Sequence, residues 1–228
     1  MALFITIPIS YIMSTRSAKQ LAESFQQHGA IVLQREELPL ANTQWEALES
    51  LLAQMDYAKV VGGDTGDAHS VWVGRFVNDV EKPEYLHALT QPLLDIVMNE
   101  EMHRFFGQLI GEYPLCIRRC QANRLFQGDF IGFHMDRDTT PDYTATAVFQ
   151  FSDQFEGGEF ILYHPEEGEK LVKLPKYSVL LNRGDIPHQV MPVQTGVRLT
   201  LACFFSTNFG ATSKPRSEIK IASTASSY

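Results

Sequence analysis

Residues 133–138 read "FHMDRD", where a histidine and a carboxylate stand two positions apart in a segment that otherwise has the composition of a β-strand. Side chains alternate between the two faces of a strand, so His134 and Asp136 are predicted to project to the same side. Two metal-binding groups on one face can begin a metal site. A chain with 7 histidines and 27 carboxylates among 228 residues contains about one such pair by chance, so the pair needs support from the rest of the sequence.

The region around this pair is rich in strand signals. Beyond Gly111, eight runs of β-branched and aromatic residues alternate with turn residues. Short strands at regular spacing are typical of an antiparallel sandwich or barrel, and we predict a mainly β fold with a double-stranded β-helix, a jelly roll of the cupin kind, as its core. The eight runs are "LCIRRCQANRLF", "FIGFHMD", "TATAVFQFS", "GGEFILYH", "EKLVKL", "YSVLLNR", "HQVMPV" and "VRLTLACFF".

The N-terminal half has a different pattern. Apolar residues at helical spacing predict helices in "SAKQLAESFQQHG" and "TQWEALESLLAQM", and two more, broken near Pro92, in "PEYLHALTQPLLDIVMNEEMHRFFGQLIG". "IVLQ" and "VWVGRFV" are expected to be short strands, and "VVGGDTGDAHS" a loop. We therefore expect one compact domain in which a helical support region (residues 1–111) packs on one outer face of the jelly-roll core (112–210), followed by a disordered tail (211–228).

The charge balance limits the partners. With 19 basic and 27 acidic residues the net charge is -8, and a chain without a basic patch is not expected to bind nucleic acid or an anionic membrane. The apolar start, "MALFITIPISYIM", lacks the features of a signal peptide and is too short to span a bilayer, so it is expected to be an N-terminal strand or disordered. Three cysteines without disulfide spacing indicate a reducing compartment, the cytoplasm.

A second pair of the same kind, His164 and Glu166 in "YHPEEGEK", serves as a comparison. Proline stands between them and glycine follows, which indicates an exposed hairpin loop. His134 and Asp136 instead lie among predicted strands, and a further histidine, His188 in "RGDIPHQV", adjoins other strands. Two histidines and one carboxylate form a facial triad, which leaves three adjacent positions open on iron(II) for oxygen and a chelating co-substrate.

An arginine lies on a predicted strand shortly after the last residue of this triad. Arg198 stands ten residues after His188 in "GVRLTLACFF", and Arg198 and Thr200 share one strand face by alternation. A lone arginine that points into an apolar barrel is costly without an anion. A bound dicarboxylate would satisfy it through two parallel hydrogen bonds.

At this point the region 123–205 resembles the iron(II)- and 2-oxoglutarate-dependent oxygenases in their prolyl-hydroxylase-like form. The motifs "NRLFQGDFIGFHMD", "FEGGEF", "DIPHQVMPV" and "GVRLT" occur in the family's order. The resemblance implies a dioxygenase that uses Fe(II), 2-oxoglutarate and O2, with ascorbate as a supporting reductant.

The same resemblance assigns roles to residues. His134, Asp136 and His188 would be the iron ligands. Arg198 would pair with the distal carboxylate of 2-oxoglutarate, with Thr200 assisting.

Two further polar residues belong to the preceding strand. Asn123 stands where DNA-repair dealkylases of the superfamily carry an asparagine that contacts the co-substrate; a polar residue at a strand end is the alternative. Many relatives have tyrosine two positions later, but Leu125 stands there and one hydroxyl contact is missing. Gln121, in phase with Asn123, is the candidate for orienting 2-oxoglutarate instead.

A looser resemblance, to the branch that hydroxylates or halogenates free amino acids and other small metabolites, points to the substrate. Halogenating members lack the carboxylate ligand, whereas Asp136 is present here. We therefore expect hydroxylation of an unactivated C–H bond of a small molecule. Arg137 and Asp138 directly follow the ligands and are substrate-contact candidates, as is Arg75 in "VWVGRFV"; a solvated surface charge is the alternative for each.

Two other classes of function stay open. One is a non-catalytic, cupin-like sensor whose triad holds metal without turnover, and the position of Arg198 argues against it. The other is a protein or peptide hydroxylase, which nothing in the sequence opposes. The sequence predicts neither the substrate's identity nor the oligomeric state.

Overall fold

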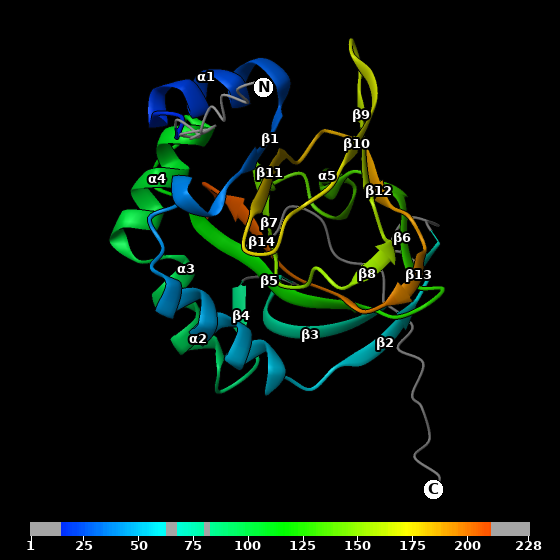
Figure 1. Cartoon of the computed structure of the whole chain (residues 1–228). Helices are drawn as coiled ribbons and strands as arrows, with labels where there is room; N and C mark the ends of the chain where they lie inside the picture. Colours follow the sequence, from blue (N-terminus) through cyan, green and yellow to red (C-terminus); the bar gives the residue numbers. More distant parts are fainter. Residues whose placement is uncertain (1–14, 63–67, 80–82, 211–228) are drawn as a thin grey trace, which may run out of the picture.

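The computed structural model describes residues 15–62, 68–79 and 83–210, which form a curled β-sheet with a layer of helices beside it (Figure 1). The expected tail at 211–228 and the apolar start at 1–13 lie outside the described residues, as do five residues of the expected loop "VVGGDTGDAHS".

Four α-helices make up the helical layer, and Figure 1 shows them together on one side of the sheet. In α1 the hydroxyl of Ser17 accepts a hydrogen bond from the backbone N–H of Gln20, whose side chain accepts from Ser17 in return. The helix ends at Gly29, whose φ of 67° is a left-handed conformation that glycine adopts without a steric penalty. No helix in the described ranges is long and apolar enough to cross a membrane. The helices are α1 (Ala18–His28), α2 (Asn42–Ala53), α3 (Thr90–Val97) and α4 (Glu100–Ile110), with two short ones, η1 (Arg35–Glu37) and α5 (Asp136–Thr139).

The strands build one large antiparallel sheet in the order β1-β11-β7-β14-β5-β3-β6-β12-β9-β10, with β2 and β4 paired to β3, and a separate pair, β8 and β13. Because β3 pairs with β5 on one side and with β6 on the other, the sheet curls back and encloses an interior. The strands are β1 (Ala30–Leu33), β2 (Ala58–Val61), β3 (His69–Asp79), β4 (Pro83–Tyr85), β5 (Cys116–Leu125), β6 (Phe130–His134), β7 (Ala145–Gln150), β8 (Phe155–Gly157), β9 (Phe160–His164), β10 (Gly168–Val172), β11 (Val179–Arg183), β12 (His188–Val190), β13 (Val193–Gly196) and β14 (Arg198–Ser206).

Strand β14 lies between β5 and β7 and shows how the sheet separates two environments. Its residues Leu201, Cys203 and Phe205 belong to a core shared with the helices. The residues between them face the enclosed interior, because side chains of a strand alternate. Aromatic contacts join the layers, with the ring centroids of Phe106 and Phe205 4.9 Å apart and those of Trp45 and Phe149 5.8 Å apart.

The predicted fold class is confirmed, and each of the eight expected runs contains a strand. In the N-terminal region β1 and β3 fall where the two short strands were expected, and β2 and β4 are strands that the sequence analysis did not predict. The segment "PEYLH" was predicted to be helical but contains β4. The break near Pro92 is also wrong: α3 begins at Thr90, so the proline falls in the first turn, where its missing N–H has no helical partner to lose. The two helices separate at Asn99, which caps α4.

A buried ion pair ties the sheet to the segment after β14. Nη2 of Arg118 on β5 lies 2.7 Å from Oδ1 of Asp79 on β3, and neither side chain is exposed. Nη1 of the same arginine donates to the carbonyl oxygens of Asn208 and Gly210, at 2.8 and 2.7 Å. Three parts of the chain therefore meet at one guanidinium group.

Replacing this arginine with methionine should destabilise the fold. The change leaves the carboxylate of Asp79 buried without its cation, which costs about 3–5 kcal/mol of unfolding free energy. Urea unfolding of Arg118→Met measures it. The matched control is Arg104→Gln, which removes a pair with Glu100 at 3.7 Å on a side chain that is 62% exposed, and which should change the free energy by less than about 1 kcal/mol. Equal effects of the two changes would contradict the role given to Arg118.

Candidate active site

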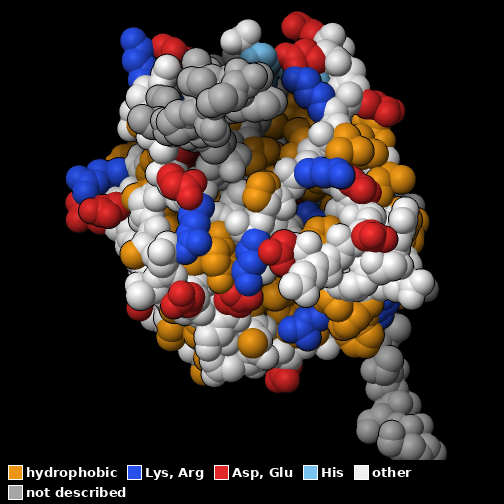
Figure 2. Space-filling model, viewed as in Figure 1, with side chains coloured by type: hydrophobic (Ala, Val, Ile, Leu, Met, Phe, Trp, Pro, Cys, Tyr) orange, Lys and Arg blue, Asp and Glu red, His pale blue; other side chains and the backbone are white. Residues whose placement is uncertain are grey.

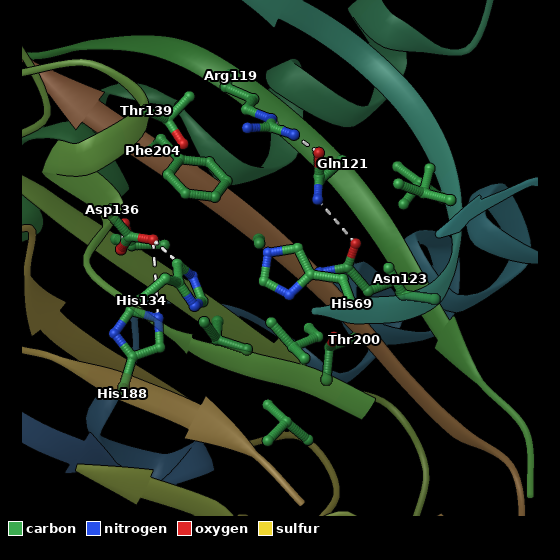
Figure 3. A pocket seen from close by; sticks show the side chains of 18 of the residues that line it. His69, Arg119, Gln121, Asn123, His134, Asp136, Thr139, His188, Thr200 and Phe204 are labelled. Carbon is green, nitrogen blue, oxygen red and sulfur yellow. Dashed lines mark hydrogen bonds and ion pairs between the residues drawn. The ribbon is translucent and has the colours of Figure 1, made fainter. Parts of the chain in front are cut away.

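A cavity of about 110 Å³ lies within the curled sheet. Strands β2, β3, β5, β6, β7, β9, β12 and β14 and the short helix α5 contribute side chains to its wall. In Figure 3, His134, Asp136 and His188 gather on one side of the cavity, while Gln121 and Asn123 lie on the other. The residues that the sequence analysis drew from distant motifs thus surround one space.

Three of these side chains form a compact cluster. His134 ends β6 and His188 begins β12, and the two residues are directly opposite in the paired strands. Oδ1 of Asp136 lies 3.6 Å from Nε2 of His134 and 3.7 Å from Nε2 of His188. Ligand atoms of all three residues lie within 4.8 Å of one another, and no other cluster of three or more potential ligands occurs in the part of the chain that the structure describes.

The backbone fixes which nitrogen of each histidine faces the cluster. Nδ1 of His134 is 2.8 Å from the carbonyl oxygen of Gly132, and Nδ1 of His188 is 2.9 Å from that of Ile186. A carbonyl oxygen can only accept, so each Nδ1 carries the hydrogen and donates it. Both Nε2 atoms therefore present a lone pair, as a metal requires. Burial also lowers the pKa of His188, against the opposing charge of Asp136, and this favours the neutral ring.

A hydrogen bond likewise fixes the orientation of the Asp136 carboxylate. Its Oδ2 accepts a hydrogen bond of 2.6 Å from the hydroxyl of Thr146 on β7, which leaves Oδ1 directed at the two histidines. Burial would raise the pKa of Asp136, but the charges that His188 and His134 carry when protonated, and the hydrogen bonds from His134 and Thr146, lower it to about 2. The carboxylate is therefore an anion at neutral pH. Two imidazoles and one carboxylate suit a divalent ion such as Fe(II).

The sequence reasoning placed His134 and Asp136 on one strand, and this is wrong for the second residue. Strand β6 ends at His134, and Asp136 begins α5. The two side chains meet because the backbone turns between them, so strand alternation is not the reason for their proximity.

Arg198 and Thr200 face the same cavity from β14. Arg198 is 2% exposed, and its side chain has no hydrogen-bond or ion-pair partner among the described residues. Burial lowers the pKa of Arg198 to about 10, which leaves it charged at neutral pH. The hydroxyl of Thr200 is buried and also lacks a partner. A buried cation beside an unused hydroxyl suits the carboxylate of a bound dicarboxylate.

Gln121 and Asn123 line the cavity from β5 and are joined in a chain of hydrogen bonds. Nε of Arg119 donates to Oε1 of Gln121 at 2.8 Å, and Nε2 of Gln121 donates to Oδ1 of Asn123 at 2.9 Å. Asn123 is directly opposite Thr200 in the paired strands. The structure thus brings both amides to the end of the cavity where Thr200 lies.

The three expected substrate contacts lie in different places. Arg75 lines the cavity from β3. Arg137 donates through Nε to the carbonyl oxygen of Tyr143 at 2.9 Å, and Asp138 accepts from the backbone N–H of Met135 at 3.0 Å. Neither of the last two side chains is part of the cavity wall, so only Arg75 is placed to touch a ligand there.

Several cavity residues escaped the sequence analysis. Arg119 was missed although it is in phase with Gln121 and Asn123, so strand alternation would have identified it. Thr146 could not be found from a sequence pattern, because its contact with Asp136, ten residues earlier, depends on how the chain folds back between α5 and β7. His69, whose ring centroid is 5.2 Å from that of His134, was assigned to a loop.

Comparisons with known proteins agree with this geometry. Residues 120–206 match the family model described as the 2OG-Fe(II) oxygenase superfamily. A PKHD-type hydroxylase of Parvibaculum lavamentivorans is 36% identical over 102 residues, which are 40% of this chain and 44% of that protein. The chain thus spans less than half the length of this curated relative.

Solved structures extend the match to most of the chain. The crystal structure of an oxidoreductase of the 2OG-Fe(II) oxygenase family from Burkholderia pseudomallei covers 89% of this chain and 95% of its own, with a TM-score of 0.79 and 26% identity. A Pseudomonas putida prolyl-4-hydroxylase covers 84% of this chain and 100% of its own, with a TM-score of 0.58 and 16% identity, and shows the fold alone. The resemblance drawn from the sequence motifs is confirmed.

Removal of one imidazole from the cluster should abolish tight metal binding. Because His188→Ala takes away one of three ligands, we expect its affinity for Mn(II), used as a probe, to fall more than about 100-fold. Electron paramagnetic resonance of free Mn(II) measures the affinity. The control is His164→Ala, because Nδ1 of His164 accepts from the backbone N–H of Glu166 in the β9–β10 turn. A loss of Mn(II) from the control equal to that from His188→Ala would contradict the assignment.

Proposed function

We propose that this chain, whose residues 120–206 carry the core of the 2OG-Fe(II) oxygenase superfamily in its prolyl-hydroxylase-like form, is a dioxygenase that hydroxylates an unactivated C–H bond of a small molecule, an amino acid or related metabolite. One observation carries the proposal. The cluster of His134, Asp136 and His188 shares a cavity with the buried, unpartnered Arg198. A metal site beside a buried anion site is what a chelating dicarboxylate co-substrate needs.

In this proposal His134, Asp136 and His188 hold Fe(II) through Nε2, Oδ1 and Nε2. Bound iron, 2-oxoglutarate and O2 together supply the oxidant: the substrate C–H becomes C–OH with one oxygen atom, and 2-oxoglutarate becomes succinate and carbon dioxide with the other. The protein's part is to fix the three ligands in advance. The carbonyl oxygens behind both histidines and the hydroxyl behind Asp136 do so.

Arg198 and Thr200 would hold the distal carboxylate of 2-oxoglutarate, and the amides of Asn123 and Gln121 would orient the rest. Oδ1 of Asn123 is already occupied by Gln121, so the Asn123 amide offers its NH2 group to a ligand. That group can donate to a carboxylate or keto oxygen. The role is therefore open to Asn123 even though Leu125 supplies no hydroxyl.

A peptide substrate is the second candidate, and one feature favours it. Phe133 adjoins the metal cluster, is 53% exposed, and has its ring centroid 5.0 Å from that of Tyr163. An exposed aromatic pair next to a reactive centre could contact an extended peptide. A screen that follows succinate formation with Fe(II), O2 and ascorbate, across free amino acids and short peptides, separates the two. Absence of oxygen-dependent succinate formation under all conditions would favour a non-catalytic sensor.

Substitution of the cavity arginine should uncouple co-substrate binding from metal binding. Arg198→Ala removes a buried charge-assisted contact, so 2-oxoglutarate should bind about thirty-fold to several-thousand-fold more weakly, which corresponds to about 2–5 kcal/mol. Titration without oxygen, with metal present, measures the affinity. Mn(II) affinity should stay nearly constant. If the variant binds 2-oxoglutarate as well as the wild type does, Arg198 has a different function.

The reaction should be hydroxylation and not halogenation. With a metal bound, the carboxylate of Asp136 would occupy the position that a halide needs, and its negative charge would reduce the attraction for a second anion. With a competent substrate in chloride or bromide, mass spectrometry should show a product that gains one oxygen and no halogen. Halogenated product from the wild type would refute Asp136 as a ligand. In Asp136→Gly, hydroxylation should collapse, and any halogenation that appeared would place a halide where the carboxylate had been.

A further inference from the structure

The cavity carries more positive charge than the proposed co-substrate can balance. Three arginines line it, Arg75, Arg119 and Arg198, and the only carboxylate in the described wall is Asp136. A divalent metal adds two positive charges, and 2-oxoglutarate brings two negative ones. Counting only Arg119 and Arg198 with Asp136, the metal and 2-oxoglutarate, the filled site would keep a net charge of about one positive unit in a chain whose overall charge is -8.

Arg119 is the cation without an assigned purpose. Its guanidinium lies 5.4 Å from the ring centroid of Phe204, and its Nε donates to Gln121. It is half-buried on the cavity wall, and it makes no ion pair with a carboxylate in the described parts of the chain. An arginine has five N–H donors, so most of its donors remain for a ligand.

The register of β5 and β14 sets Arg119 apart from the co-substrate arginine. Arg119 is opposite Phe204, whereas Arg198 is opposite Leu125. The two backbone positions are six residues apart along the strand, roughly 20 Å at the rise of an extended chain. A five-carbon acid anchored at Arg198 and at the metal leaves the Arg119 end of the cavity to a second molecule.

A second arginine reaches the cavity beside this end. Arg75 on β3 is directly opposite Gln121 on β5, two residues from Arg119. Its Nη1 donates to Oδ1 of Asn78 at 3.3 Å. An anion held by Arg119 at this end would also lie near the guanidinium group of Arg75 and would be attracted by both charges.

We propose that the substrate is an oxyanion, with a carboxylate or a phosphate held by Arg119 with the help of Arg75. This inference rests on the proposed function and names the substrate's charge. The chain of hydrogen bonds from Arg119 through Gln121 to Asn123 joins the substrate end to the co-substrate end. Because a guanidinium can only donate, Arg119 fixes the orientation of the Gln121 amide, and Gln121 in turn fixes that of Asn123.

Paramagnetic relaxation by the metal tests the inference without turnover. The protein is loaded with Mn(II) and saturating 2-oxoglutarate, and three probes are titrated: inorganic phosphate, followed by its phosphorus signal, and carbon-13-labelled formate and formamide. Relaxation falls steeply with distance, so only a probe held near the metal responds. Formate or phosphate should bind to the wild type and formamide should not, and the preferred anion tells a carboxylate from a phosphate substrate.

Variants then locate the anion. In Arg119→Gln the affinity for the preferred anion should fall about ten- to hundredfold, because a charged hydrogen-bond partner is lost. Arg119→Lys keeps the positive charge but loses the paired N–H donors of the guanidinium group, so its affinity for the anion should lie between those of the wild type and Arg119→Gln. The matched control is Arg124→Gln, which should retain wild-type affinity, because Arg124 lies on the same strand but is placed 4.0 Å from the ring centroid of Tyr57, outside the cavity.

Several results would overturn the inference. These are equal relaxation of formate and formamide in the wild type, no relaxation of either anion, or equal anion affinity in the wild type and Arg119→Gln, which would mean direct binding to the metal. The first two results are measured on the wild-type protein, so a variant that fails to fold cannot affect them. Failure of the proposed function looks different: Mn(II) or 2-oxoglutarate itself would then not bind to the wild type, and the inference would fall with it.

Discussion

The pairing register of β5 with β14 is the constraint on which the site depends. It is antiparallel and joins residues from Arg198 opposite Leu125 to Ser206 opposite Cys116. Side chains alternate, so a slip by one residue would turn Arg198 and Thr200 toward the helices and bring Cys203 into the cavity. The polar side chains that β5 and β14 contribute to the cavity wall are therefore specified together by one set of backbone hydrogen bonds.

The outer face of these strands holds the register in place. Phe205 packs on Phe106 of α4, and the sulfur atoms of Cys120 and Cys203 are 3.6 Å apart in a fully buried contact between the paired strands. None of the four long helices contributes a side chain to the cavity wall. Their contribution is apolar burial, which makes any other register expose hydrophobic surface. The helical layer therefore supports the chemistry without touching the ligands.

Local sequence predicted the strands well, because alternation and turn residues report on the backbone directly. It also placed Arg198 and Thr200 on one face, where they lie. It failed where a contact depends on how neighbouring elements fold against each other: no sequence pattern around Thr146 indicates that its hydroxyl meets Asp136, ten residues earlier in the chain. The helix forecast for "PEYLH" failed because pairing with β3 decides the conformation there. Asp136 lies beside His134 as expected, but the reason is a turn of the backbone into α5 and not the alternation of side chains along a strand.

The two carbonyl oxygens behind His134 and His188 also bear on how the protein acquires its metal. They orient the two histidine rings so that both Nε2 atoms can bind a metal without rearrangement. The third ligand of the cluster is an oxygen atom, and the cluster contains no thiolate. Affinities of such donor sets rise from manganese through iron to copper, and a rigid geometry with open positions does not reverse that order. Selection of iron by this site would then depend on which metals are available as well as on the ligands. The metal content of the purified protein would consequently reflect the growth medium and the buffers as much as the protein itself.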